Sequence, residues 1–302
     1  MTQQSRWKNK KILNVCDPGG ENCSAQFSPV DDKGNNSPAL TTIIVTRGRA
    51  TLLSRSLRSL EAQQMFPLKV LVIVDDCPTT YRFLESLPPL GGAVNSFKWI
   101  AVKRTALERS GPKRLSVLRN LALEMVDTYW CSYLDDDNEL EPTHFRTLVH
   151  CAMRTASPAA HSWRSLWLRD GTPFCLRERH PWCRDPALST KLFNQYVEAG
   201  IYQVGSNVVQ DQVVPHRRSE SMVDMSEWLF VTDFIRRLGF VNEYCAEDWQ
   251  TSRAEDSKLL DAIVATGLRI PSTQQCTLRY YMGGYSNDWS NAAAQIEGWC
   301  RE

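Results

Sequence analysis

In YWCSYLDDDNELEP, residues 129–142, an apolar run ends in three consecutive aspartates. The apolar part has the length and composition of a buried strand, which would deliver Asp135, Asp136 and Asp137 to its carboxyl end. Open α/β proteins bind their ligands at that edge of the sheet. Because three adjacent carboxylates repel one another, a cation among them makes their clustering less costly. The stretch therefore predicts an α/β sheet with an anionic, cation-binding edge.

The spacing of the three aspartates predicts the kind of cation. Successive side chains of an extended chain alternate sides, so Asp135 and Asp137 face one way and Asp136 the other. Such a pair suits a hard divalent ion, Mg²⁺ or Mn²⁺, that also binds phosphate oxygens. An EF-hand calcium loop does not fit, because residues 135–146 lack a glycine at the sixth position and a glutamate at the twelfth. The alternative is a solvated acidic loop that caps the helix after Pro142.

Strand and helix patterns upstream lead to the same edge. Residues 40–45 and 68–74 are short, β-branched runs typical of buried parallel strands, and leucines at helical spacing lie between them. The second run ends at Asp75 and Asp76, so acids from two strands meet at one edge. Residues 96–102 predict a third strand, and residues 112–126 a helix that leads into the opening stretch.

The second half of the chain is less regular. It predicts helices over Thr143–Arg154, Trp228–Leu238 and Ser257–Ala265, a glycine cap at Gly267, and strands around Ser162–Leu168, Gln203–Val209 and from Leu268 to Ile270. Residues 1–38 are expected to be an irregular arm and residues 286–302 a tail. Residues 39–150 and 151–285 are expected to form the two halves of one domain.

Composition and charge narrow the function classes. A formal net charge of +1 gives no argument for binding nucleic acid. No apolar run approaches the ~18 to 20 residues that span a bilayer, and Met1–Lys11 lacks the apolar core of a secretory signal. We therefore expect a cytoplasmic protein without a transmembrane segment. The ten cysteines show no CxxC pair and no common zinc spacing, which indicates mostly buried free thiols.

Four motifs, taken together, resemble family 2 glycosyltransferases of the GT-A fold. They are the opening strand and helix from Thr42 to Gln63, the strand end Val72–Asp76, the R-N-x-A run Arg119–Ala122 and the strand end Tyr133–Asp137. The resemblance covers residues 40–150 well and residues 220–270 loosely. It implies a Rossmann-like, mostly parallel sheet flanked by helices, with a mixed C-terminal half that binds the acceptor.

The chain departs from the family at several positions. The usual Asp-Asp-Gly-Ser is Asp-Asp-Cys-Pro at residues 75–78, and Pro-Thr-Tyr-Asn is Val-Thr-Arg-Gly at residues 45–48. The Q-x-x-R-W motif of processive members is absent. The turn at residues 46–49 also lacks the G-x-G-x-x-G pattern of dinucleotide-binding proteins, which disfavours a dehydrogenase.

The resemblance implies metal-dependent transfer of a sugar from a nucleoside diphosphate, most often a UDP-sugar, to an acceptor hydroxyl with inversion. Asp137 would be the first ligand of Mn²⁺ or Mg²⁺ and Asp135 the next, with Asp135 alternatively holding ribose or a metal-bound water. The residues implied in binding the donor are Thr46, Arg47, Arg49, Asp75, Asp76, Arg119, Asp135 and Asp136.

The general base has two candidate positions, because Glu-Asp pairs occur at Glu247-Asp248 and at Glu255-Asp256. The family's spacing from this pair to a glycine favours Asp256, since Gly267 follows at that distance. The adjacent tryptophan that the family often shows favours Asp248. Capping of the following helix explains Glu255 and Asp256 equally well.

Two other functions fit parts of the sequence. A nucleotidyltransferase also uses acidic metal ligands on an α/β domain, but it usually carries a glycine-rich loop with a lysine after its first strand, which residues 46–49 lack. A non-catalytic protein of the same fold is the other alternative, and the Cys77-Pro78 departure keeps it open.

Overall fold

The structure is a computed structural model that describes residues 40–64, 67–105, 111–183, 185–246, 248 and 253–284. The expected arm at residues 1–38 and the expected tail at residues 286–302 lie outside the described residues. The strands are β1 Leu40–Thr46, β2 Leu68–Asp75, β3 Val94–Val102, β4 Trp130–Tyr133, β5 Glu139–Leu140, β6 Ala159–Trp167, β7 Val208–Val209, β8 Trp228–Val231 and β9 Ser272–Tyr281. The helices are α1 Ala50–Glu61, α2 Pro78–Ser86, α3 Pro112–Glu124, α4 His144–Arg154, α5 Pro186–Glu198, α6 Thr232–Leu238, α8 Glu255–Ala265 and the 3-10 turns η1 Arg218–Glu220 and η2 Met225–Glu227.

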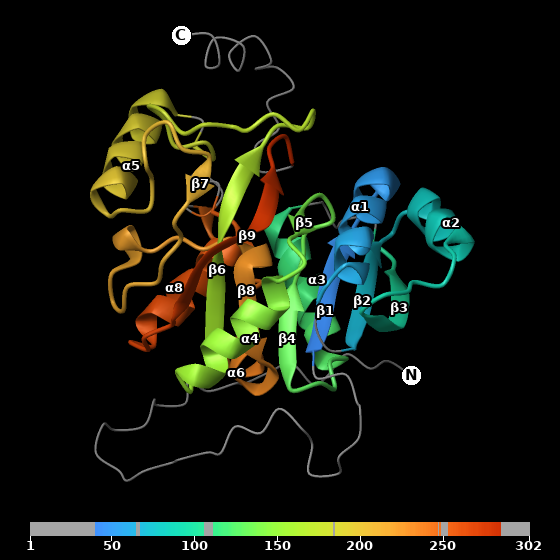
Figure 1. Cartoon of the computed structure of the whole chain (residues 1–302). Helices are drawn as coiled ribbons and strands as arrows, with labels where there is room; N and C mark the ends of the chain where they lie inside the picture. The colour runs from blue at the N-terminus through green and yellow to red at the C-terminus, as the bar shows by residue number, and fades with distance from the viewer. Residues whose placement is uncertain are drawn as a thin grey trace.

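One sheet runs through the described part of the chain (Figure 1), in the order β3-β2-β1-β4-β8-β6-β9-β5 with β7 paired to β6. Its first four strands are parallel, because β1 pairs with β2 and β4 and β2 pairs with β3 in that sense. Antiparallel pairing begins where β8 meets β4 and β6. The predicted α/β fold with a mixed C-terminal half is therefore confirmed.

Two hydrophobic cores lie on opposite faces of the sheet. In β2, Val70, Val72 and Val74 pack with α1, α2 and α4, whereas Leu71 and Ile73 pack with α3, α6 and α8. Alternate residues of one strand thus face both cores, which explains why the sequence shows an unbroken apolar run there. A third cluster packs α5 against the ends of β6 and β9.

Three predicted elements differ in the structure. The helix predicted over Trp228–Leu238 is wrong in its first half, because residues 228–231 form β8 between β4 and β6. A short, fully apolar run fits a buried helix or a buried strand equally, so sheet pairing decides. The strand predicted from Leu268 begins only at Ser272, and the strand predicted over Gln203–Val209 is limited to Val208–Val209.

Two helices were not predicted, although each carries a start signal. Both α2 and α5 have a proline in the first turn, Pro78 and Pro186, where its missing N–H costs nothing. In α5, Asp185 also caps the helix by accepting from the N–H of Leu188 at 2.7 Å.

The described cysteines only partly match the expectation. All seven are free thiols, but only Cys131 and Cys151 are buried, so the prediction of mostly buried thiols is wrong for this part of the chain. Within the described residues, no helix has the length and apolar character needed to span a bilayer.

Candidate active site

The candidate site lies where the parallel strands end. Thr46 at the end of β1 is paired in register with Val74, one residue before Asp75 ends β2. Tyr133, the last residue of the neighbouring β4, pairs with Ile43 of β1. The acids that follow β2 and β4 are thereby brought to the same edge of the sheet, and arginines from three other segments meet them there.

The first group links three motifs that are far apart in the sequence. Arg119 of α3 donates from Nη2 to Asp135 Oδ1 at 3.0 Å and from Nη1 to Glu255 Oε1 at 2.6 Å. Arg119 is 5% exposed, and burial alone would lower its pKa, but the charges of Glu255 and Asp135 outweigh burial and raise it. Burial likewise raises the pKa of Glu255, against the opposing charge of Arg119. Arg119 therefore joins the end of β4 to the start of α8.

The second group surrounds the other two aspartates. Arg49, just before α1, forms ion pairs from Nη2 to Asp136 Oδ1 at 2.5 Å and from Nη1 to Asp137 Oδ2 at 2.6 Å. Asp136 is fully buried, and burial raises its pKa to about 7 although Arg49 acts in the opposite direction. Burial also raises the pKa of Asp137. Arg55 fixes the same loop by donating to the backbone oxygen of Asp137. Thr46 is buried beside this group, and its hydroxyl has no hydrogen-bond partner among the described residues.

The side chains available as metal ligands decide whether a metal ion fits at this site. No group of three or more His, Cys, Asp and Glu side chains in the described ranges is arranged around a common ion. Asp135 and Asp137 keep 31% and 14% of their side chains exposed, and each is bound by a different arginine. Two partly exposed carboxylates fit an ion of the Mg²⁺ type, because such ions take one or two carboxylates and fill the remaining positions with water and substrate phosphates.

The third group holds the carboxylate at the end of β2. Asp75 Oδ1 accepts from Arg104 Nε at 2.9 Å and from Arg114 Nε at 3.0 Å, and Arg104 also forms an ion pair with Oδ2. Burial alone would raise the pKa of Asp75, but the hydrogen bonds from both arginines lower it. Arg47 donates to the backbone oxygen of Asp75 at 3.2 Å. Asp76 follows in a left-handed conformation with φ 44°, which aspartate tolerates better than most residues.

Sequence reasoning missed Arg104 and Arg114. A signal existed for Arg104, because it follows β3 closely, as the acids follow β2 and β4. Ser226 was missed as well. Its hydroxyl accepts from the backbone N–H of Asp135 at 3.1 Å, so η2 supports the end of β4.

The two candidate bases lie in different surroundings. Asp256, in the first turn of α8, accepts from the N–H of Ser257 at 2.6 Å. Asp248 is held by Lys258 at 2.7 Å and by the N–H of Cys245 at 2.9 Å, and the Lys258 hydrogen bond, followed by that of Cys245, lowers its pKa to about 2. Its sequence neighbours 247 and 249 lie outside the described residues.

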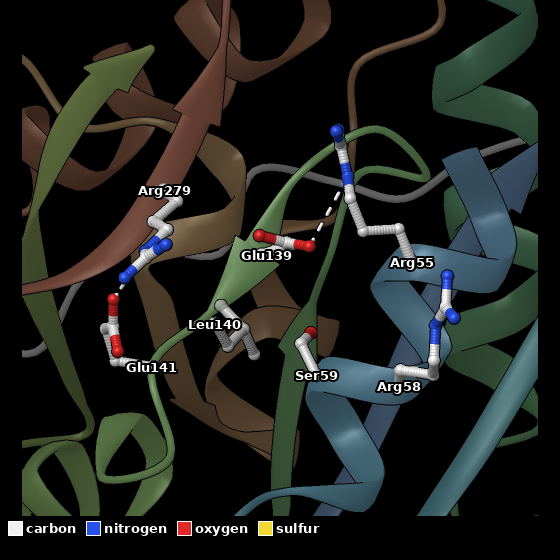
Figure 2. A pocket seen from close by; sticks show the side chains of 7 residues that line it. All are labelled: Arg55, Arg58, Ser59, Glu139, Leu140, Glu141 and Arg279. Atoms are coloured by element: carbon white, nitrogen blue, oxygen red, sulfur yellow. Dashed lines mark hydrogen bonds and ion pairs between the residues drawn. The ribbon is translucent and has the colours of Figure 1, made fainter. Parts of the chain in front are cut away.

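A cavity of about 380 Å³ flanks the site between α1, β5 and β9. Figure 2 shows Arg55 projecting from α1 toward Glu139 of β5, Arg58 beside it on the same helix, and Arg279 of β9 on the far side of Glu139. Arg55 pairs with Glu139 at 3.5 Å, and Arg279 pairs with the remaining lining carboxylate, Glu141, at 2.6 Å. Arg58 has no side-chain partner among the described residues. The cavity is therefore polar and close to neutral, and it shares Arg55 with the Asp137 loop.

Comparisons with known proteins agree with this architecture. Residues 41–157 match the model of Glycosyl transferase family 2. No curated protein sequence matches the chain. The fold is similar to S. aureus TarS 1–349, with a TM-score of 0.52 and 13% identity over 85% of this chain and 64% of that one. The complex of that fragment with UDP-GlcNAc has a TM-score of 0.50 and 13% identity, over 80% of this chain and 58% of that one. The complex with UDP has a TM-score of 0.51 and 13% identity, over 80% of this chain and 60% of that one.

The chain thus spans 64% of the length of the TarS fragment. At this identity the likeness shows the fold, which is that of GT-A glycosyltransferases. The resemblance to family 2 glycosyltransferases noted in the sequence is confirmed by the family match over residues 41–157 and by this fold.

Proposed function

We propose that this protein transfers a sugar from a nucleoside diphosphate donor to an acceptor hydroxyl, with inversion at the anomeric carbon. The observation that carries the proposal is the meeting of three carboxylate–arginine groups at the ends of β2 and β4 and the start of α8. These groups lie in a chain that matches glycosyl transferase family 2 over residues 41–157. In this proposal residues 39–150 bind the donor and residues 151–285 bind the acceptor.

Asp75 is proposed to bind the nucleoside. Because Arg104 and Arg114 lower its pKa, Asp75 is ionised at neutral pH and accepts hydrogen bonds from a base N–H or from ribose hydroxyls. Asp76 and Arg47 lie next to it and are proposed to contact the same part of the donor. A UDP-sugar is the proposed donor, supported by the UDP and UDP-GlcNAc complexes of TarS.

Asp135 and Asp137 are proposed to hold Mn²⁺ or Mg²⁺. A bound ion of this kind neutralises charge on the diphosphate as the sugar departs. The contribution of this chain is to fix the two carboxylates, since Arg119 orients Asp135 and Arg55 holds the backbone at Asp137. Asp136 is fully buried and is proposed to support the loop after β4 through its ion pair with Arg49 rather than to touch the donor directly.

Asp256 is proposed as the general base that takes the proton from the acceptor hydroxyl. Glu255 is bound to Arg119 and positions the first turn of α8, which places Asp256 beside the same group. Asp248 is the weaker candidate, because a carboxylate with a pKa of about 2 is a poor proton acceptor at neutral pH. Direct displacement by the activated hydroxyl would give inversion. No feature of the described residues favours the nucleotidyltransferase or the non-catalytic alternative.

Thermal unfolding with UDP, GDP, CDP and dTDP, each with and without Mn²⁺, tests the donor and metal parts. We expect UDP with Mn²⁺ to raise the melting temperature most, since a ligand at 100 times its Kd adds about 2.7 kcal/mol to stability. Asp137→Asn should lose the manganese-dependent part of that shift. Asp127→Asn is the matched control, because Asp127 pairs with Lys69 at the amino ends of β2 and β4, at the opposite edge of the sheet from the candidate site. Equal shifts with and without Mn²⁺ for all four nucleotides would refute metal-assisted donor binding.

A further inference from the structure

Arg49 occupies the position between the two carboxylates that a cation would share. Its guanidinium bridges Asp136 and Asp137 at 2.5 and 2.6 Å. Asp136 is fully buried, and the ion pair with Arg49 compensates the burial of its charge. The side chain of Arg49 as a whole remains 22% exposed, although its Nε is buried.

A divalent ion at Asp137 and the Arg49 guanidinium compete for the same carboxylate. Asp137 exposes 14% of its side chain, so the approach to it is narrow, and the guanidinium already lies on Oδ2. Two cations in that space would repel each other. An ion can therefore bind firmly only when Arg49 finds another anionic partner.

The donor supplies such a partner. Guanidinium groups bind phosphate oxygens with two parallel hydrogen bonds, much as they bind carboxylates. Rotation of the Arg49 side chain about its χ angles leaves the backbone bond from Leu53 N–H to Arg49 O in place. Arg55 holds the backbone at Asp137 independently of Arg49, which keeps the loop in place when the guanidinium leaves.

We propose that Arg49 is the counter-ion of Asp136 and Asp137 in the donor-free protein, and that the donor diphosphate draws it away so that metal and donor bind cooperatively. The inference rests on the proposed function and extends it to the order of binding. By thermodynamic linkage, the diphosphate raises metal affinity by the same factor as the metal raises diphosphate affinity.

Titration of free Mn²⁺ by electron paramagnetic resonance, with the full chain and with or without saturating UDP, tests this inference without requiring an acceptor. In the wild-type protein, UDP should raise Mn²⁺ affinity by about 5- to 150-fold. Arg49→Gln should bind Mn²⁺ about 10-fold more tightly than wild type when UDP is absent, and should gain less from UDP. Arg58→Gln is the matched control, since Arg58 lies in the adjoining helix α1 and is also an arginine but contacts neither Asp136 nor Asp137. It should behave like wild type.

Arg49→Lys provides a second variant in case loss of the cation unfolds the protein around Asp136. Lysine keeps one charge but cannot bridge two carboxylates, so its Mn²⁺ affinity without UDP should lie between those of wild type and Arg49→Gln. The inference is overturned if both variants bind Mn²⁺ without UDP no more tightly than wild type. If wild type and variants then show the same UDP-dependent binding, the proposed function survives. If no form binds Mn²⁺ even with UDP, the metal part of the proposed function fails together with the inference.

Discussion

Arginine partners give the acids at the sheet edge different charge states. Asp75 has two guanidiniums against its carboxylate, and its pKa is lowered. Asp136 is more deeply buried, shares one guanidinium with Asp137, and has a pKa raised to about 7. One edge of the sheet therefore combines Asp75, whose pKa is lowered, with Asp136, a carboxylate that needs a nearby cation to stay charged.

The choice of general base can be tested with two conservative variants. Asp256→Asn should lower the transfer rate by roughly 10²- to 10⁴-fold, the usual contribution of a positioned base. Nucleotide binding should persist, because asparagine keeps the oxygen that accepts from the N–H of Ser257. The measurement is the release of nucleoside diphosphate from the donor identified by the unfolding screen.

Asp248→Asn is the comparison variant for that assay. It should keep the wild-type rate but lower thermal stability, because it weakens the contacts with Lys258 and Cys245. A large loss of rate in Asp248→Asn with full activity in Asp256→Asn would transfer the base to Asp248.

The sequence identified these acids but not their partners. Asp135 and Asp137 could be predicted because they end an apolar run, which is a local pattern. The contact between Arg119 and Glu255 spans 136 residues, and that between Arg104 and Asp75 spans 29, so no local pattern encodes either one. Pairing of this kind is decided by the strand order, which brings β1, β2 and β4 together.

At the scale of elements, hydrophobic periodicity predicted a strand or helix correctly where the apolar pattern is continuous or helically spaced. It failed where pairing with neighbouring strands decides whether a segment is a strand or a helix. The β1–α1–β2 unit was predicted because its apolar residues are continuous in the strands and helically spaced between them. The segment at Trp228–Val231 is just as apolar, but it is a strand only because β4 and β6 lie on either side of it. The residues of β9 are mostly polar in its first half, so apolar patterning placed the start of that strand too early, at Leu268 instead of Ser272.

The turn between α2 and the edge strand β3, which packs against the end of α1, makes a specific steric prediction. Gly92 has φ +59°, and an added Cβ would lie 2.1 Å from the backbone oxygen of Glu61. Gly92→Ala should lower the free energy of unfolding by roughly 2 to 5 kcal/mol, the combined cost of a left-handed alanine and of overpacking. Urea denaturation measures this change.

Gly171→Ala separates the two costs. Gly171 also has a left-handed backbone, φ +87°, but nothing lies within 4 Å of its added Cβ. The loss there should be only roughly 1 to 2 kcal/mol. Equal losses for both variants would mean that the turn moves away from α1 without penalty, contrary to the close packing seen here.

At the scale of the whole molecule, one buried network supports the candidate site at the strand ends from the mixed half of the sheet. Arg164 of β6 faces three carboxylates: Glu227 at 3.0 Å, Asp211 at 3.5 Å and Asp224 at 3.7 Å. The network adjoins Ser226, whose hydroxyl accepts from the N–H of Asp135. One guanidinium cannot neutralise three buried carboxylates, so the native state is expected to hold extra protons.

The excess of carboxylates gives stability a defined dependence on pH. Burial raises the pKa of Asp211 to about 7 from its ordinary value of 3.8, with Arg164 acting in the opposite direction, so the native state binds more protons than the unfolded state in that interval. Stability from this group is therefore present at low pH and is lost as the pH rises toward about 7.

Asp211→Asn should stabilise the protein at about pH 8 and have little effect at about pH 4 in urea denaturation. Arg164 keeps Glu227 as a partner in that variant. Asp127→Asn should show the opposite sign, because a hydrogen bond from Lys69 lowers the pKa of Asp127, and its removal costs stability only above that pKa. If Asp211→Asn proves less stable than wild type at about pH 8, Asp211 is ionised and favourably paired with Arg164. That result would contradict the expectation that the native network holds extra protons.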